Sequence, residues 1–200
     1  MAVQRTRLTQ GLIQVYTGNS KGKSTAAFGL VTRAVGHGFK SYIIQFMKGS
    51  PYYGEMATWQ RLYPQVQFRQ YGRICPRSTL IRQGEATCIG CGQCFVLKGQ
   101  ATEEDLRGAE LALARAKEIM LSDEFDLLIL DELNNALYFD LLKVEPVLDL
   151  LRQKPPQVEV VITGRNAPPE IIEIADLVTE MREIKHPFNK GIPSRRGIEY

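Results

Sequence analysis

The sequence predicts an α/β fold in which a mostly parallel sheet carries helices on both faces. Three observations support this prediction. Short runs rich in β-branched and aromatic residues alternate with segments of helical periodicity, as parallel strands alternate with crossover helices. Residues 125–130 (FDLLIL) are nearly continuously apolar, as a central parallel strand is. A glycine loop that carries Lys and Ser joins the first strand-like run to the first helical segment.

The composition is that of an ordinary globular protein with one domain. Its 200 residues are enough for a full core, and 44% of them are hydrophobic and 24% charged. The net charge of +3 is too small to indicate nucleic acid binding, but it suits small anionic ligands. The chain has no run of 18 apolar residues, and its N-terminus lacks the apolar core of a signal peptide. We therefore expect a cytoplasmic protein that makes no use of a membrane.

Six segments have the composition of strands. The first, residues 12–17 (LIQVYT), is rich in β-branched and aromatic side chains and precedes the glycine loop. Residues 66–71 (VQFRQY) alternate as a strand with one solvated face does. The predicted strands are residues 12–17, 41–46, 66–71, 125–130, 158–163 and 177–181. Ligands are expected at their carboxyl ends, where open parallel sheets bind them.

Helical segments separate these strands. The first begins near Lys23 and ends at a glycine stop signal around His37. Residues 102–105 (TEED) form a capping box that opens a helix with a face of apolar and small residues. The predicted helices are residues 23–35, 54–62, one that begins at 102, 134–142, 145–151 and 170–175. The chain shows no internal repeat and no linker. Residues 11–200 are therefore predicted to form a single domain, preceded by an N-terminal arm at residues 1–10.

The loop after the first strand, residues 18–25, has the chemistry of a phosphate-binding loop. Its glycines permit backbone angles that turn successive N–H groups toward one anion, and the helix that follows adds its dipole. Lys23 is expected to reach phosphate oxygens, and the Ser24 hydroxyl is expected to bind Mg²⁺. The predicted nucleotide contacts are Gly18, Asn19, Ser20, Lys21, Gly22, Lys23, Ser24 and Thr25. The loop is one residue shorter than G-x-x-x-x-G-K-[ST], which suggests that the triphosphate is not cradled as in an ordinary ATPase.

Two acidic residues and an arginine follow other predicted strands. Asp131 or Glu132 would face the phosphate loop and hold Mg²⁺ directly or through water. Because neighbouring side chains of a regular strand point to opposite faces, we expect only one of them to reach the site. The alternative is a pair of carboxylates that begins a helix, where the helix dipole favours them. Arg165 follows residues 158–163 and is either a second phosphate contact or a plain surface arginine.

All four cysteines of the chain lie in one glycine-bearing segment. Cys75, Cys88, Cys91 and Cys94 have the spacing C-x12-C-x2-C-x2-C. In a reducing compartment such a set indicates metal ligands rather than disulfides. Structural zinc is usually held by two separated C-x2-C pairs, whereas three close cysteines and a distant one beside a proline are nearer to iron–sulfur ligation. We favour a four-iron cluster, with zinc and free buried thiols as the alternatives.

Several motifs together resemble the ATP:corrinoid adenosyltransferases of the cobalamin pathway. They are GNSKGKSTAAFG, TRAVGHG, QFMKG, LDEL, ITGR-x-AP, ADLVTEM, KHPF-x-x-GI and the final RRGIEY. The resemblance spans residues 11–200 except for the insertion at about residues 72–99, which we name the cysteine segment. It implies a RecA-like P-loop NTPase fold, a homodimer, and ATP and a corrinoid as substrates in adenosylcobalamin biosynthesis or salvage.

The reaction implied by this resemblance transfers the 5′-deoxyadenosyl group of ATP to cobalt(I) of the corrinoid and releases triphosphate. Because the cobalt is itself the nucleophile, no activated side chain or general base is needed. Lys23, Ser24 and Glu132 are the expected catalytic residues, acting on the triphosphate directly or through Mg²⁺. Arg33 and Arg165 fall within matching motifs and are expected to contact the nucleotide. The competing function is a P-loop ATPase or phosphotransferase whose metal-binding loop serves a partner.

The cysteine segment takes the place of a short aromatic-bearing loop that covers the corrinoid in relatives, and Phe95 is a candidate for that role here. A cluster in this segment would be placed to pass an electron to cobalt(II), with a partner such as a flavoprotein reductase as the electron donor. The simpler alternative is a metal ion that only folds the loop, which has no obvious core of its own.

Overall fold

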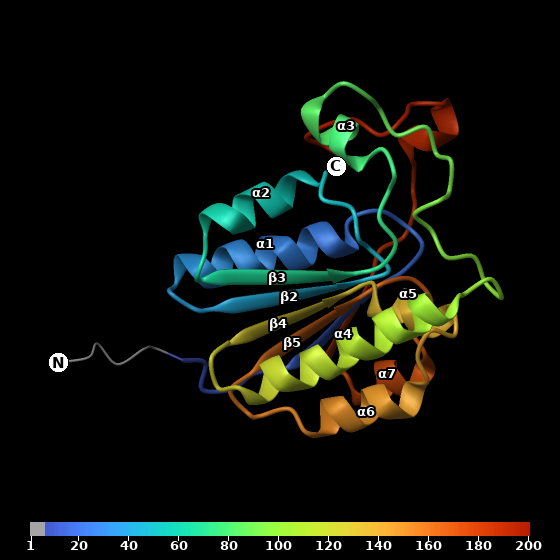
Figure 1. The fold of residues 1–200 in the computed structure, drawn as a ribbon. Coiled ribbons are helices and arrows are strands. Elements are labelled where there is room, and N and C mark those ends of the chain that lie inside the picture. Colours follow the sequence, from blue (N-terminus) through green and yellow to red (C-terminus); the bar gives the residue numbers. More distant parts are fainter. Residues whose placement is uncertain (1–6) are drawn as a thin grey trace.

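The structure is a computed structural model that describes residues 7–200, so residues 1–6 of the predicted N-terminal arm lie outside the described part. Figure 1 shows one twisted sheet between two layers of helices. The strand order is β3-β2-β4-β5-β1-β6, and all neighbouring strands are parallel. The strands are β1 Ile13–Thr17, β2 Ser41–Phe46, β3 Val66–Tyr71, β4 Leu127–Asp131, β5 Glu159–Thr163 and β6 Leu177–Glu180. This confirms the predicted α/β fold of the P-loop NTPase kind.

Helices cover both faces of the sheet, with α1 and α2 on one side and α4 to α7 on the other (Figure 1). They are α1 Lys23–Gly36, α2 Gly54–Arg61, α3 Ser78–Gln83, α4 Glu103–Leu121, α5 Leu133–Tyr138, α6 Val144–Arg152 and α7 Pro169–Ile174, followed by the 3-10 turn η1 Pro187–Lys190. The sequence did not predict α3, because six residues are too few to show helical periodicity. Within residues 7–200, no helix has both the length and the apolar character needed to cross a bilayer.

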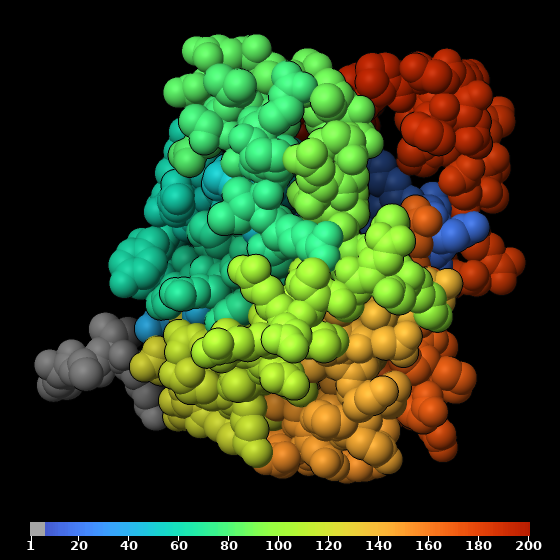
Figure 2. Space-filling view, turned by 45° about the vertical axis from the view of Figure 1, so that its right-hand side comes forward, coloured from blue at the N-terminus to red at the C-terminus, as the bar shows by residue number. Residues whose placement is uncertain are grey.

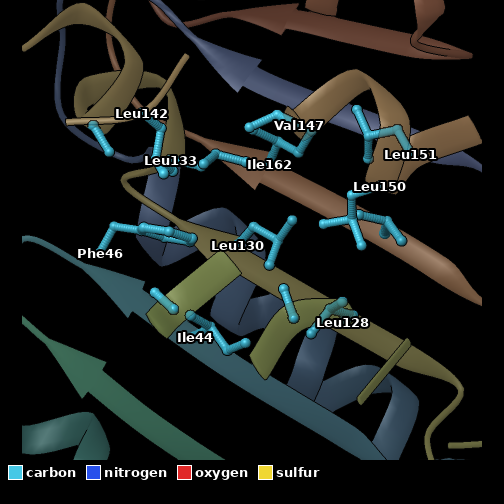
Figure 3. Close-up of a cluster of buried hydrophobic side chains, with 14 of the residues drawn as sticks. Ile44, Phe46, Leu128, Leu130, Leu133, Leu142, Val147, Leu150, Leu151 and Ile162 are labelled. Atoms are coloured by element: carbon cyan, nitrogen blue, oxygen red, sulfur yellow. The ribbon is translucent and has the colours of Figure 1, made fainter. Parts of the chain in front are cut away.

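The central strands are apolar throughout because both of their faces are covered. Ile43, Ile129 and Val161 pack with residues of α1 and α2 on one face. Ile44 and Leu130 belong to the larger cluster on the other face, which α4 to α7 complete. Figure 3 shows this larger cluster, in which side chains of the sheet meet those of the covering helices. Burial on both faces removes the polar–apolar alternation that marks a strand with one solvated face.

The first described residues are held by hydrogen bonds at the end of the sheet where the parallel strands begin. Asp126, the one polar residue in the predicted strand at residues 125–130, is fully buried. Its carboxylate accepts the backbone N–H of Lys40 at 2.8 Å and the Nε–H of Arg7 at 3.1 Å. The Arg7 guanidinium also donates to the carbonyl oxygen of Phe125. The buried carboxylate is therefore paired, and the part of the arm that the structure describes docks on its own chain.

The predicted capping box opens α4 and also holds the cysteine segment. The Asp105 carboxylate accepts the Thr102 N–H at 2.8 Å, while the Asp105 N–H donates to Thr102 Oγ1 at 3.3 Å. The same carboxylate accepts Nε–H and Nη2–H of Arg73, at 2.9 and 2.6 Å. The Arg73 guanidinium also donates to the carbonyl oxygens of Phe95 and Gln100. The hydrogen bonds from Arg73, and then those from Thr102, lower the pKa of Asp105 to about 2.

We expect Asp105→Asn to lower the free energy of unfolding by about 1–2 kcal/mol near pH 7, because it removes the ion pair and weakens the cap. The stabilisation from Asp105 is complete above its unfolded pKa of 3.8 and is lost as the pH falls toward about 2. Urea unfolding curves of variant and wild type should therefore differ near neutral pH and converge in acid. Glu104→Gln, in the same exposed first turn, is the control. A difference that did not depend on pH would contradict this assignment.

Candidate active site

The phosphate loop lies between β1 and α1, where the sequence predicts it. Gly18 has a φ of 98°, and a Cβ there would lie 2.3 Å from the carbonyl oxygen of Met181, so a larger residue does not fit. Gly22 precedes α1, whose first N–H groups have no partner within the helix. Lys23 Nζ donates to the carbonyl oxygens of Gly18 at 3.0 Å and Ser20 at 2.6 Å. The short loop is therefore a compact anion-binding turn that closes around its own lysine.

Two carboxylates and a lysine meet at the end of β4. Asp131 is fully buried, and Glu132 follows it with a φ of 63°. Lys48, just after β2, has its Nζ 2.8 Å from Asp131 Oδ2 and 3.8 Å from Glu132 Oε1. Of the two carboxylates only Glu132 lines the cavities described below, but both face the same lysine. The reason is local, because the left-handed conformation of Glu132 ends the regular alternation of the strand.

Asp131 is held by hydrogen bonds from several elements. Its carboxylate accepts Gln45 Nε2–H at 2.9 Å and the Thr163 hydroxyl at 2.7 Å, in addition to Lys48. The nearby Ser24 side chain of the phosphate loop also lowers the pKa of Asp131. Burial would raise the pKa of Asp131, but Lys48 and these hydrogen bonds outweigh it and hold the pKa below its usual range. Asp131 is thus an ionised group that orients Lys48.

Glu132 is the more accessible of the two carboxylates. It lines the cavity over the phosphate loop, and one of its oxygens accepts Asn135 Nδ2–H at 2.5 Å. Its backbone N–H donates to Thr163 Oγ1 at 3.0 Å, which fixes the turn between β4 and α5. Burial, and then the charge of Asp131, raises the pKa of Glu132, although Lys48 opposes this shift. A cation bound in the cavity would relieve this repulsion between the two carboxylates.

The first cavity, with a volume of about 810 Å³, opens over the phosphate loop. Figure 2 shows the loop, in blue, in a hollow between the cysteine segment, in green, and the C-terminal segment, in red. The C-terminal wall was not predicted from the sequence. It consists of Glu183, His186, Phe188, Asn189, Gly197, Ile198, Glu199 and Tyr200. Lys21 Nζ lies 2.8 Å from Glu199 Oε1, so an ion pair joins the phosphate loop to this wall.

The second cavity, with a volume of about 540 Å³, adjoins the first at the carboxyl edge of the sheet. Part of its lining is apolar: Met47, Phe95, Val96, Tyr138 and Phe139. Five residues line both cavities: Lys48, Tyr53, Glu132, Asn135 and Arg165. The two cavities therefore meet at the ends of β2, β4 and β5, where the carboxylates and Lys48 lie.

The two predicted arginines are placed differently. Arg165 lines both cavities, and its backbone N–H donates to Asn135 Oδ1 at 2.7 Å. Arg33 lies in the last turn of α1, about 13 Å along the helix axis from Ser24, and it lines neither cavity. Of the two arginines, the structure brings Arg165 to the phosphate loop and leaves Arg33 away from it.

Lys48 is the site residue that sequence reasoning missed. A signal for it was present, because the motif QFMKG ends β2 at the edge of the sheet where ligands bind. The partner was not visible, because Lys48 and Asp131 are 83 residues apart in the chain. The strand pairing of β2 with β4 brings them together.

One of the four cysteines, Cys94, lies at the second cavity. Cys75 is buried, Cys94 is half-buried, and Cys88 and Cys91 are exposed. Cys94 and Phe95 line the second cavity, so the cysteine segment forms part of its wall. Among residues 7–200, no three His, Cys, Asp or Glu side chains already stand in an arrangement that would hold a metal ion. The predicted metal at these cysteines stays a prediction.

Comparison with known proteins identifies the family. A family model described as ATP:corrinoid adenosyltransferase BtuR/CobO/CobP matches residues 9–200. The chain is similar to a corrinoid adenosyltransferase of a Sinorhizobium species, with 40% identity over 96% of this chain and 81% of the relative. It is also similar to the corrinoid adenosyltransferases of Escherichia coli K12, with 37% identity over 96% and 86% of the two chains, and of Pseudomonas aeruginosa, with 35% identity over 99% and 88%. With a phosphate loop, paired carboxylates and an adjoining apolar cavity, the chain belongs to the ATP:corrinoid adenosyltransferase family.

Proposed function

We propose that the two adjoining cavities hold the two substrates of adenosyl transfer, with ATP on the phosphate loop and the corrinoid in the second cavity. The observation that carries this proposal is the shared wall, because Lys48, Glu132 and Arg165 line both cavities. A group that passes between two substrates has to be transferred where their sites meet. The first cavity is lined by positively charged side chains and N–H groups that can bind phosphates. The second is lined in part by apolar side chains that can pack against a macrocycle.

The reaction forms a bond between cobalt(I) and C5′ of the ribose and breaks the bond between C5′ and the triphosphate oxygen. The electron pair of the broken bond leaves with the triphosphate. Since the substrate supplies the nucleophile, no side chain has to remove a proton. The protein has to direct C5′ toward the second cavity and stabilise the negative charge of the leaving group. Lys23, the N–H groups of the phosphate loop and Arg165 are the groups we assign to this second task.

Ser24 and Glu132 fit a magnesium ion that is bound together with the triphosphate. Mg²⁺ takes oxygen ligands, usually one or two from the protein with the rest from water and phosphates. Glu132 and Ser24 both line the first cavity, and Ser24 is near enough to Asp131 to lower the pKa of that carboxylate. Asp131 is already occupied by its own hydrogen bonds, so we assign it an indirect role through Ser24. When bound, the ion would neutralise charge on the departing triphosphate.

Phosphoryl transfer to an acceptor is the competing function of such a loop. It requires an acceptor hydroxyl or water near the γ-phosphate and a side chain that orients it. The cavity that adjoins the one over the phosphate loop is instead walled in part by Phe95, Val96 and Phe139. Aromatic and aliphatic side chains suit a large, flat ligand better than they suit a polar acceptor.

We also propose that the enzyme works as a homodimer in the cytoplasm. The use of ATP as a substrate supports the proposed location in the cytoplasm. The edge strand β6 supports the dimer, because all four of its residues are exposed, among them Leu177 and Val178. An exposed apolar edge strand is a surface that a second copy of the chain would cover.

The assay that tests the function is anaerobic incubation of the protein with ATP, Mg²⁺ and a chemically reduced cobalt(I) corrinoid. We expect a light-sensitive organocobalt product and inorganic triphosphate in equal amounts. Cobyrinic acid a,c-diamide, cobinamide and cobalamin, compared side by side, would identify the preferred substrate. Release of ADP with no change in the corrinoid spectrum would support the phosphotransferase instead.

Arg165→Ala should lower kcat/KM for ATP by about 10- to 100-fold, because it removes a charge-assisted contact worth about 1.5–3 kcal/mol. Arg33→Ala is the matched control and should leave kcat/KM nearly unchanged, because Arg33 lines neither cavity. The same adenosyl-transfer assay measures both variants. Equal losses in the two would show that Arg33 reaches the nucleotide, for example across a subunit interface.

Lys48→Met should lower the free energy of unfolding by about 3–5 kcal/mol, because it leaves the buried charge of Asp131 without its partner. The double variant Lys48→Met/Asp131→Asn removes that charge and should regain most of the loss. Neither protein should regain full activity, because Lys48 lines both cavities. Urea unfolding and the adenosyl-transfer assay measure the two effects. A single variant as stable as the double variant would rule out this role for the ion pair.

A further inference from the structure

Residues 195–200 form a compact turn beside the phosphate loop, and we name them the C-terminal turn. The backbone N–H of Glu199 donates to the carbonyl oxygen of Arg195 at 2.9 Å, and that of Gly197 donates to the main-chain oxygen of Tyr200 at 2.7 Å. Gly197 has a φ of 78°, a conformation that favours glycine. Residues 197–200 line the cavity over the phosphate loop. The turn is therefore a well-defined wall of that cavity.

Two contacts fix the C-terminal turn to neighbouring segments. The Arg196 guanidinium donates to the carbonyl oxygen of Arg82, near the end of α3, at 3.3 Å. The Tyr200 ring meets the Tyr52 ring edge to face, with 5.6 Å between the ring centres. Figure 1 shows the C-terminus beside α3, in agreement with these contacts. Groups outside the phosphate loop thus hold the turn next to it.

The C-terminal turn places a carboxylate on the phosphate loop. Glu199 Oε1 lies 2.8 Å from Nζ of Lys21. The same carboxylate accepts the backbone N–H of Arg195 at 2.7 Å and two N–H groups of its guanidinium at 3.1 Å. The Glu199 side chain is 17% exposed, against 44% for Lys21. Because Arg195 already holds the carboxylate in place, the ion pair with Lys21 costs little further side-chain entropy.

Both lysines of the phosphate loop are engaged by oxygen atoms of the chain itself. Lys23 Nζ donates to the carbonyl oxygens of Gly18 and Ser20, whereas Lys21 pairs with the Glu199 carboxylate. A hydrogen bond to a charged acceptor is stronger than one to a neutral carbonyl. Like a phosphate oxygen, the Glu199 oxygen is an anionic acceptor for the lysine ammonium. Glu199 therefore occupies Lys21 in the way that a phosphate would.

We propose that Glu199 competes with the triphosphate of ATP for Lys21, so that the C-terminal turn is an autoinhibitory contact on the phosphate loop. The proposal rests on the assignment of ATP to the first cavity. When a phosphate takes Lys21, Glu199 keeps its hydrogen bonds to Arg195, so neither the carboxylate nor the lysine loses all of its partners. When the triphosphate leaves, Glu199 pairs with Lys21 again. The contact weakens the binding of ATP and of the product triphosphate alike.

Titration calorimetry with inorganic triphosphate and Mg²⁺ measures this competition. Glu199→Gln removes the charge that pairs with Lys21 and should bind triphosphate about two- to fivefold more tightly, the range expected for an exposed ion pair. Glu183→Gln is the matched variant, because it removes the same charge from the same wall, where the partner of the carboxylate is Asn189. It should give a clearly smaller gain. Weaker binding by Glu199→Gln, or equal gains in the two variants, would overturn the proposal.

A double-mutant cycle isolates the ion pair from the general charge of the cavity wall. With Lys21→Gln already present, Glu199→Gln should change the triphosphate affinity by less than about 1.5-fold, because the group for which it competes is gone. The adenosyl-transfer assay gives a second readout. Added triphosphate should inhibit Glu199→Gln at a concentration lower by the same factor that calorimetry gives. An equal gain with and without Lys21 would contradict the competition.

The wild type separates this proposal from the proposed function. A wild type that binds neither ATP nor triphosphate would contradict the assignment of ATP to the phosphate loop, and the competition with it. A wild type that binds both, with no gain from Glu199→Gln, would contradict the competition alone.

Discussion

The active site is organised by the buried contact between Lys48 and Asp131. A buried ion pair costs desolvation energy, so its value here lies in the geometry that it imposes rather than in stability. Lys48 follows β2, Asp131 ends β4, and Thr163, which donates to Asp131, ends β5. The pair thus connects three neighbouring strands at their carboxyl ends. Ser24 of the phosphate loop is near enough to lower the pKa of Asp131, so the pair also adjoins that loop.

A single backbone angle lets this arrangement serve two substrates. Because Glu132 adopts a left-handed conformation, its carboxylate turns toward Lys48 and not to the opposite face of the sheet. Glu132 consequently lines both cavities, as Lys48 and Arg165 do. Charged groups suited to a triphosphate therefore lie next to the apolar walls of the second cavity. A reaction in which the leaving group is anionic and the nucleophile is a metal in a macrocycle needs this adjacency.

The remaining walls come from segments with little regular structure. The C-terminal residues close one side of the first cavity, where Glu199 pairs with Lys21. The cysteine segment closes one side of the second cavity, where Arg73 connects it to the first turn of α4. Segments held by few apolar contacts open more readily than the core of a fold. The sheet provides the platform, and these two segments complete the walls of the cavities on it.

The sequence by itself determined the elements and the phosphate loop, because each depends on residues that are close in the chain. The runs at residues 41–46 and 66–71 form strands with the predicted bounds, and Thr102 and Asp105 cap α4 as predicted. Only the tertiary structure decided that both carboxylates face one lysine, that Arg165 and not Arg33 lies at the cavity, and that the C-terminal segment walls the cavity over the phosphate loop. The pattern of apolar and polar residues along a helix or strand predicts which of its faces is buried. The order of the strands in the sheet decides which strand ends lie next to one another. In this chain the sheet order brings together groups 83 residues apart, a distance at which periodicity carries no information.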